Sequence, residues 1–92
     1  MSGSIKDIVM NIEIYNIEKK NGGIHYIEKY EAVATLFGDN IRIYFEIENT
    51  AISKIYKVEI LDKNINVPII DAKRLLLKQI TYLDQHKLLN HL

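Results

Sequence analysis

Residues 41–48, with the sequence IRIYFEIE, alternate without exception between apolar and polar positions. The apolar positions are Ile41, Ile43, Phe45 and Ile47. Successive side chains of a β-strand point to opposite faces of the sheet, so strict alternation is typical of a strand with one buried and one exposed face. The chain must therefore provide neighbouring strands beside this segment and a second layer that covers its apolar face.

Three groups of turn-forming residues interrupt the first two thirds of the chain: Asn21–Gly23, Gly38–Asp39 and Asn49–Ala51. Glycine and asparagine tolerate the backbone conformations that tight turns require. The segments between these turns predict four β-strands, at about 8–19, 24–37, 41–49 and 55–62. Residues 64–70, which contain the only proline, Pro68, are expected to connect the last strand to a helix.

The two hairpin turns predict the register of the first three strands. A three-residue loop at Asn21–Gly23 and a two-residue type II′ turn at Gly38–Asp39 place the same side chains on one face of the sheet. The predicted inner rows are Ile8–Leu36–Ile41, Met10–Ala34–Ile43, Ile12–Ala32–Phe45 and Ile14–Tyr30–Ile47. The agreement between two independently chosen turns indicates a three-stranded antiparallel meander.

The fourth strand adds Tyr56, Val58 and Ile60 to the inner face, but its register is open. A two-residue turn at Thr50–Ala51 pairs Arg42 with Glu59, whereas a longer loop pairs Glu46 with Lys57. The longer loop is favoured because the turn contains no glycine.

The segment from Asp71 onward predicts the helix that covers the inner face. Its apolar residues fall on one side of a helical wheel. They form a stripe of Ala72, Leu76, Ile80 and Leu83, with Leu75, Tyr82 and Leu89 alongside. Asp71 is expected to be the N-cap, with Ile70 and Leu75 at the spacing of a hydrophobic staple, while His86, Lys87 and His91 suit the negative helix end. The predicted fold is α+β, a four-stranded antiparallel β-meander with one C-terminal α-helix packed on one face (ββββα).

Length and composition limit what this fold can do. The chain has 92 residues, 12 Lys and Arg against 12 Asp and Glu, and no cysteine. We expect one domain over residues 1–92, with residues 1–4 disordered or a cloning remnant, and neither disulfides nor thiolate chemistry. Because no apolar run approaches the ~20 residues of a membrane span and no secretory segment is present, we expect a cytoplasmic protein without a membrane partner.

Three leucines lie outside the predicted core stripe of the helix: Leu77, Leu88 and Leu92 fall roughly opposite it by the 3.6-residue period. Surplus apolar surface on a small protein is typical of a binding face. The sequence therefore predicts a homodimer in which Leu77 and Leu88 pack against their symmetry mates, or a protein partner on the same face. The alternative is a frayed end at Leu88 and Leu92, which leaves only Leu77 to explain.

The outer face of the predicted sheet carries Tyr15, Lys29, Arg42 and Tyr44. Aromatic rings between cations can stack unpaired bases, so single-stranded nucleic-acid binding is the alternative function. Zero net charge and the glutamates of the same face disfavour this interpretation, because phosphate-binding proteins usually carry a basic excess. The chain is also rich in Ile, Lys, Asn and Tyr, which indicates AT-rich codon usage and weakens arguments from lysine or tyrosine number.

The predicted register also places Glu13, Glu31 and Glu46 in one row across the outer face. Like charges directly opposite each other are unfavourable, and three carboxylates within reach can bind a hard cation or share protons. Two simpler interpretations are favoured. Either Lys29 and Lys57 neutralise the row, or a bulge near Glu31 breaks it.

Motifs for catalysis are missing from the sequence. His86 and His91 are five residues apart, which is off the spacing that places two ligands on one helix face, and His25 lies far away in the chain. The serines and threonines have no His or Asp partner at a recognisable spacing, and no helix follows Gly22–Gly23 to make a phosphate loop. We therefore expect no catalytic residue, cofactor or metal, and predict a small non-enzymatic protein-interaction or regulatory module that self-associates.

Overall fold

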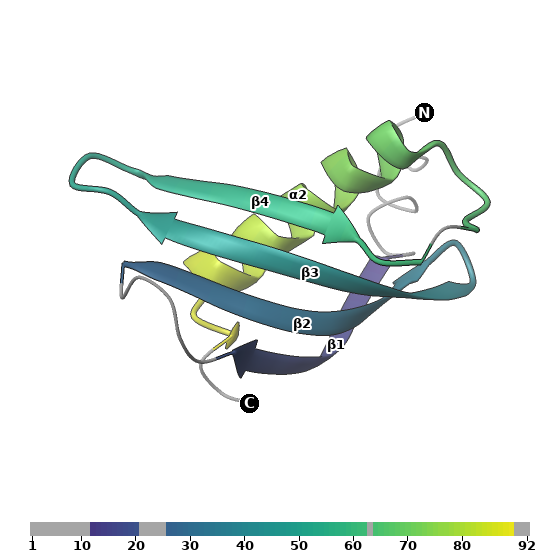
Figure 1. The fold of residues 1–92 in the computed structure, drawn as a ribbon, viewed down its shortest axis with the longest axis horizontal. Coiled ribbons are helices and arrows are strands. Elements are labelled where there is room, and N and C mark those ends of the chain that lie inside the picture. Colours follow the sequence, from purple (N-terminus) through teal and green to yellow (C-terminus); the bar gives the residue numbers. More distant parts are fainter. Residues whose placement is uncertain (1–11, 21–25, 63, 90–92) are drawn as a thin grey trace.

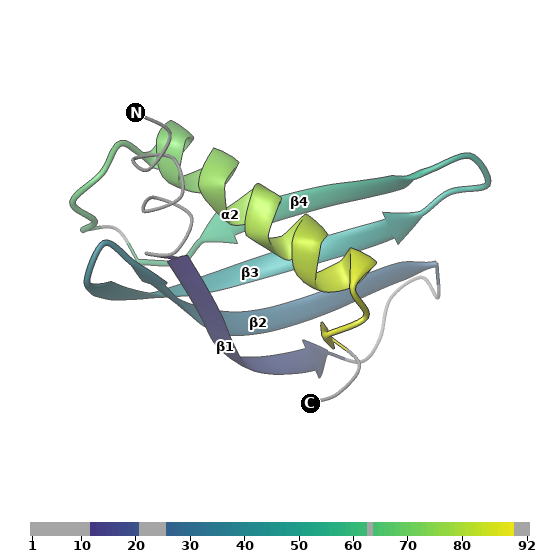
Figure 2. The same cartoon turned by 180° about the vertical axis from the view of Figure 1, so that it is seen from behind.

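The computed structural model describes residues 12–20, 26–62 and 64–89. Its elements are β1 (Ile12–Lys20), β2 (Ile27–Leu36), β3 (Asp39–Asn49), β4 (Lys54–Ile60) and α2 (Ile69–Gln85). The strands form one antiparallel sheet in the order β1-β2-β3-β4 (Figure 1), and α2 crosses one face of it (Figure 2). The predicted ββββα fold is confirmed. The predicted contacts of Ile8 and Met10 lie outside the described residues.

The core lies between the inner face of the sheet and α2. The side chains that alternate inward along the strands are buried, as the period-two pattern predicts. The strands contribute Ile12, Ile14, Tyr30, Ala32, Ala34, Leu36, Ile41, Ile43, Phe45, Ile47 and Val58. At the centre, the rings of Tyr30 and Phe45 stack with centroids 4.9 Å apart. Because α2 packs against the edge strands β1 and β4, it closes over the central strands between them.

The hairpin between β2 and β3 corrects the predicted turn. Phe37 and Gly38 form the turn, both with positive φ, and Leu36 pairs with Asp39. Ala34 therefore lies opposite Ile41 and not Ile43, a slip of two residues from the predicted register. Since a slip of two keeps every side chain on its face, the predicted inner face is confirmed although its rows are wrong.

The pairing of β1 with β2 is also displaced from the predicted register. Ile12 lies opposite Leu36 and Ile14 opposite Ala34, so the strand has moved by four residues and kept its faces. The register then shifts between Tyr15 and Glu18, where Asn16 has a φ of 52°. Asparagine accepts this left-handed conformation better than most residues, so it is a suitable residue for a bulge.

The fourth strand follows the favoured of the two open registers. Glu46 lies opposite Lys57, and Arg42 is not paired with Glu59. The loop is closed by Thr50, whose backbone N–H donates to the carbonyl of Ser53 at 2.9 Å. Val58 is buried under α2, while the side chains of Tyr56 and Ile60 pack partly against the core.

The start of α2 differs from the predicted one. The helix begins at Ile69 with Pro68 as its N-cap, so Asp71 lies in the first turn, where Arg74 donates to its carboxylate at 2.9 Å. Proline suits a helix start because its fixed φ fits the first turn and no N–H is lost. Ile70 is therefore a helical residue, 77% exposed, and not half of a hydrophobic staple.

The end of α2 also departs from the sequence interpretation. Lys87 takes a φ of 57°, and the N–H groups of Leu88 and Lys87 donate to the carbonyls of Leu83 at 2.8 Å and Asp84 at 3.0 Å. These two bonds make a Schellman motif, which ends a helix and reverses the chain. The reversal carries Leu89 back into the core, where it is buried. No basic residue lies in the last helical turn.

Candidate functional site

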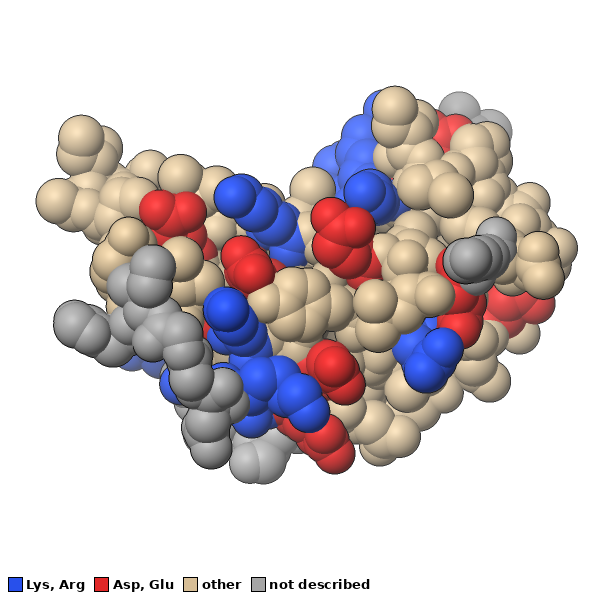
Figure 3. Space-filling model, in the orientation of Figure 1, with Lys and Arg blue, Asp and Glu red and all other residues tan. Residues whose placement is uncertain are grey.

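Charged side chains on the outer face of the sheet form ion pairs and hydrogen bonds with one another. Arg42 is fixed on Asp62, whose carboxylate accepts the backbone N–H at 2.8 Å and the guanidinium Nε and Nη2 at 3.2 Å each. The backbone N–H of Arg42 is the first cause that holds the pKa of Asp62 below its usual range, followed by its guanidinium, against an opposing effect of burial. Figure 3 shows cationic and anionic side chains interspersed over this face.

The two predicted stacking tyrosines are also engaged within the sheet. Tyr44 donates its hydroxyl to Glu46 at 2.6 Å, and Tyr15 donates to the side chain of Asn40 at 3.0 Å. Burial, followed by the hydrogen bond to Glu46, raises the pKa of Tyr44 to about 12. Lys29 lies opposite Glu46 on β3. The structure thus brings Lys29, Arg42 and Tyr44 onto neighbouring strands, but carboxylates lie beside each of them.

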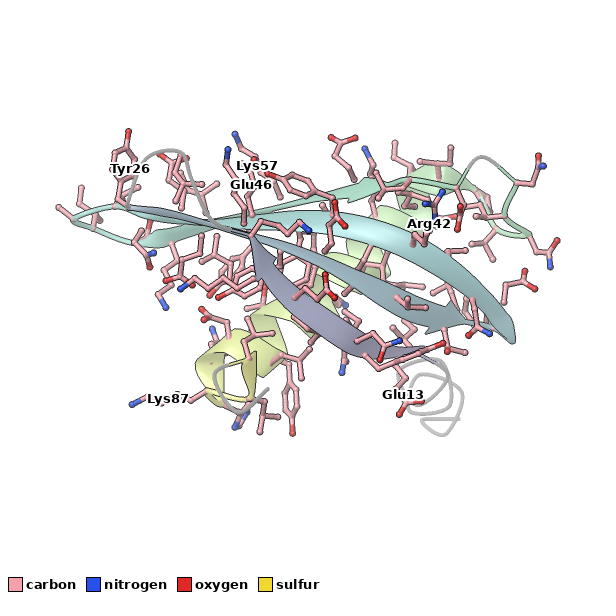
Figure 4. The ribbon with its side chains drawn as sticks, turned by 60° about the horizontal axis from the view of Figure 1, so that its bottom comes forward. Glu13, Tyr26, Arg42, Glu46, Lys57 and Lys87 are labelled. Atoms are coloured by element: carbon pink, nitrogen blue, oxygen red, sulfur yellow. The ribbon has the colours of Figure 1, made fainter. Side chains whose placement is uncertain are left out.

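The predicted row of three glutamates is not formed. Because β1 is displaced by four residues, Glu13 lies opposite Thr35, and Figure 4 shows it well separated from Glu46. Glu46 itself lies between Lys29 and Lys57 on the two neighbouring strands. The predicted three-carboxylate cation site is not assembled, since Glu13 is no neighbour of Glu31 or Glu46.

The remaining member of that row, Glu31, meets a different carboxylate. It lies opposite Glu18 on the far side of the β1 bulge. Lys20 is 3.8 Å from the carboxylates of both Glu18 and Glu31. The like charges are therefore bridged by a cation, which relieves the repulsion that a direct pair would suffer.

A polar hollow of about 450 Å³ at the β2–β3 turn end of the sheet escaped the sequence interpretation. Its walls include Asp39, Asp62, Asn64 and Asn66, and the amide of Asn66 donates to Asp39. The signal in the sequence is the alternation of oxygen-bearing residues from Asp62 to Asn66. The carboxylate of Asp62 already accepts hydrogen bonds from Arg42. Among the described residues, no group of three or more His, Asp or Glu is placed to hold a metal ion.

Apolar exposure is concentrated on β4 and α2. Of the nine large apolar side chains that are exposed within the described residues, six belong to β4, the residues flanking it, or α2. These are Ile52, Ile55, Leu61, Ile69, Ile70 and Tyr82. Tyr82 is 51% exposed, contrary to its predicted place beside the core stripe. Ile55 in β4 and Leu61 just after its end are apolar residues at outward positions of the alternation, which is the signal that could have identified them.

The exposed side of α2 bears a shallow groove of about 640 Å³. Ile70, Leu77 and Tyr82 contribute its apolar lining, and cations flank them at Lys73 and Arg74. Leu77 is half-buried and also packs against the core, so it does not stand opposite the core stripe as predicted. Part of Leu77 nevertheless lines the groove and is accessible to solvent.

The other two predicted interface leucines do not extend this surface. Leu88 is 41% exposed, but it follows the Schellman motif and so does not continue the helical line from Leu77. Leu92 lies outside the described residues. The predicted helix-to-helix line of Leu77 and Leu88 is therefore wrong, because the helix ends before the second leucine.

Side-chain contacts hold α2 against β4. Tyr56 donates its hydroxyl to Asp84 at 2.6 Å, and the ammonium of Lys54 lies 3.0 Å from the same carboxylate. Near the other end of the strand, Lys73 reaches to 4.0 Å from Glu59. These contacts hold α2 along the edge of the sheet that β4 forms.

Comparisons with protein-family models, with curated proteins and with solved structures give no match. Within the part of the chain that the structure describes, no helix has the length and apolar character needed to cross a membrane.

Proposed function

We propose that this chain is a small non-enzymatic protein-interaction module that associates with a second copy of itself. The single observation that supports this function is the apolar exposure of β4, its flanking residues and α2. A small domain exposes scattered apolar side chains at little cost, but apolar exposure concentrated on two packed elements is typical of a binding surface.

These elements carry two exposed surfaces, one on each layer of the molecule. The groove on α2 offers apolar contacts beside cations, and β4 carries Ile55 and Leu61 beside both charge signs. Interface cores commonly combine apolar anchors with a charged rim. A two-fold contact requires a patch that is complementary to itself, and mixed charge on the same element meets that requirement.

The outer sheet face supports a nucleic-acid partner less well. A base-stacking platform needs cations that are free to bind phosphates, whereas Arg42 is bonded to Asp62 and a carboxylate lies beside Tyr44. The contacts on the outer face therefore favour the interaction module over the nucleic-acid alternative.

Sedimentation equilibrium of the purified chain over a hundredfold range of concentration tests the proposal. We expect the average mass to rise from that of one chain, 10.7 kDa, towards twice that value. A mass that stays at one chain throughout the range would overturn self-association. Ile70 is exposed and Leu76 is buried. We therefore expect the Ile70→Asp variant to stay folded and the Leu76→Asp variant to unfold, so the pair separates a change of the surface from a loss of the core.

A further inference from the structure

β4 is an edge strand with an open side. In the described sheet, β3 is its only neighbour. The backbone N–H of Leu61 donates to the carbonyl of Arg42 at 2.9 Å. The odd-numbered residues of β4 therefore direct their backbone N–H and C=O groups towards β3. Because alternate residues of an antiparallel strand direct their backbone groups to opposite sides, Tyr56, Val58 and Ile60 direct theirs to the open edge.

The two edges of the sheet differ in how well they can accept another strand. β1 is interrupted at Asn16 and continues into Lys19 and Lys20, and a bulge and lysines are devices that prevent edge pairing. β4 pairs along its seven residues without a register shift and carries exposed Ile55, 43%, with Leu61, 42%, just after its end. The open edge of β4 is the better template for strand addition.

A second copy of β4 can pair antiparallel to the first in only a few registers. Inner side chains must meet inner side chains, so the two-fold axis must pass through a residue pair rather than between residues. An axis at Lys57 sets the two lysines against each other, and an axis at Glu59 does the same for the glutamates. An axis at Tyr56 sets Ile55 against Lys57. Each of these registers places like charges or unlike polarity in contact.

An axis at Val58 gives complementary pairs along the strand. Lys57 then lies opposite Glu59 of the second copy, Ile55 opposite its Leu61, and Tyr56 opposite its Ile60, and the symmetry repeats each pair. The edge-facing groups of Val58 meet those of the same residue in the second copy, as a hydrogen-bonded antiparallel pair requires. Charge pairing and apolar pairing therefore select the same register.

We infer that two copies of this chain associate through β4, antiparallel about Val58, to form one continuous sheet. This inference rests on the proposed self-association and names its surface. The contact covers Ile55 and Leu61, whose exposure on an outward strand face is otherwise unfavourable. Lys73, which lies 4.0 Å from Glu59, must release it; this costs little because exposed ion pairs contribute little.

Charge reversal at Lys57 and Glu59 tests the register. In Lys57→Glu, two glutamates of each copy surround the axis, and in Glu59→Lys two lysines do, so each variant should self-associate about tenfold more weakly than the unaltered chain. An equimolar mixture restores opposite charges in the mixed pair. We expect the mixture to associate about as tightly as the unaltered chain.

A matched control uses the same charge change away from the edge. Lys29 lies on the central strand β2, opposite Glu46, so Lys29→Glu should leave association unchanged. Because Lys57 also faces Glu46 within its own chain, thermal melts of each variant separate loss of folding from loss of association. Amide exchange of the unaltered chain gives a second measurement, since the Tyr56, Val58 and Ile60 amides should gain protection as concentration rises.

The outcomes distinguish this inference from the proposed function. A chain that stays monomeric overturns both. A chain that dimerises while its β4 amides gain no protection, or whose Lys57→Glu and Glu59→Lys variants fail to recover on mixing, overturns the β4 register and leaves self-association standing. If a variant fails to fold, the concentration-dependent protection of the three amides still decides the question.

Discussion

Three tyrosine side chains each donate a hydroxyl hydrogen bond to a carboxylate. Tyr30 donates to Glu28 at 2.7 Å, while Tyr44 and Tyr56 donate to Glu46 and Asp84 at 2.6 Å each. Burial first, and then the hydrogen-bonded carboxylate, raises the pKa of Tyr44 and Tyr56 to about 12 and that of Tyr30 still further. An ionised tyrosine at these places would lie partly desolvated beside a carboxylate.

These contacts predict loss of stability at alkaline pH. Above the unfolded tyrosine pKa of about 10, the unfolded chain releases protons that the folded chain keeps, so stability is complete below that pH and falls as the pH rises towards 12. Urea unfolding from pH 8 to 12 measures the loss. Tyr56→Phe should reduce this pH dependence and cost about 0.5–1.5 kcal/mol at neutral pH. Unchanged urea midpoints across the range would contradict the assignment.

The Schellman motif predicts a stabilising substitution at its left-handed residue. Lys87 is exposed and has a φ of 57°, a conformation that costs a non-glycine residue about 1–2 kcal/mol. Glycine avoids that cost but loses more entropy on folding. We expect Lys87→Gly to raise the free energy of unfolding by up to about 1 kcal/mol, measured by urea denaturation. Lys87→Ala, which removes the same charge but keeps Cβ, should give no such gain.

At the scale of elements, the sequence predicts faces better than registers. The inner face of β3 was predictable because its alternation has no exception. The register of β4 was predictable because the turn at Thr50–Ala51 contains no glycine, which favours the longer loop that pairs Glu46 with Lys57. The β2–β3 register was not, since Ala34 fits opposite Ile41 as well as opposite Ile43. A slip of two leaves burial unchanged, so hydrophobic patterning cannot detect it.

The end of α2 shows the same limit for the candidate surface. A helical wheel extends its period without a stop signal, and Lys87 replaces the glycine that usually marks a helix end. The wheel therefore placed Leu88 in line with Leu77, whereas the chain turns back to bury Leu89. Ile55 and Leu61, by contrast, break the polar phase of β4 in the sequence itself and were open to prediction.

The packing of α2 over the central strands predicts a size limit at Ala34. This side chain has no exposed surface and lies opposite Ile14 and Ile41. Ala34→Phe should destabilise the domain by about 1–3 kcal/mol through overpacking, as measured by thermal or urea unfolding. Val33→Phe on the outer face of the same strand provides the control and should cost less. Equal effects at the two positions would mean that the inner face has room to spare.

In the whole molecule, α2 covers one face of the sheet but does not cover its edges. α2 packs against β1 and β4 from one face, so the central strands are enclosed on that face, while among the described residues no strand pairs with the outer edge of β4. β4, its flanking residues and α2 also carry most of the exposed apolar side chains of the described residues. A second copy that pairs with β4 would satisfy the backbone N–H and C=O groups at this edge.

Self-association predicts a melting temperature that depends on protein concentration. Each tenfold rise in concentration above the dissociation constant stabilises a dimer by about 1.4 kcal/mol, or about 0.7 kcal/mol per chain, because only the folded state associates. For a domain of this size that corresponds to a rise of about 3–6 °C in Tm per tenfold, measurable by calorimetry. Lys57→Glu at the same concentrations provides the comparison, and its Tm should change less. A Tm that is constant over a hundredfold range for the unaltered chain would show that folding is not linked to association, and the exposed surface of β4 and α2 would then need a different partner.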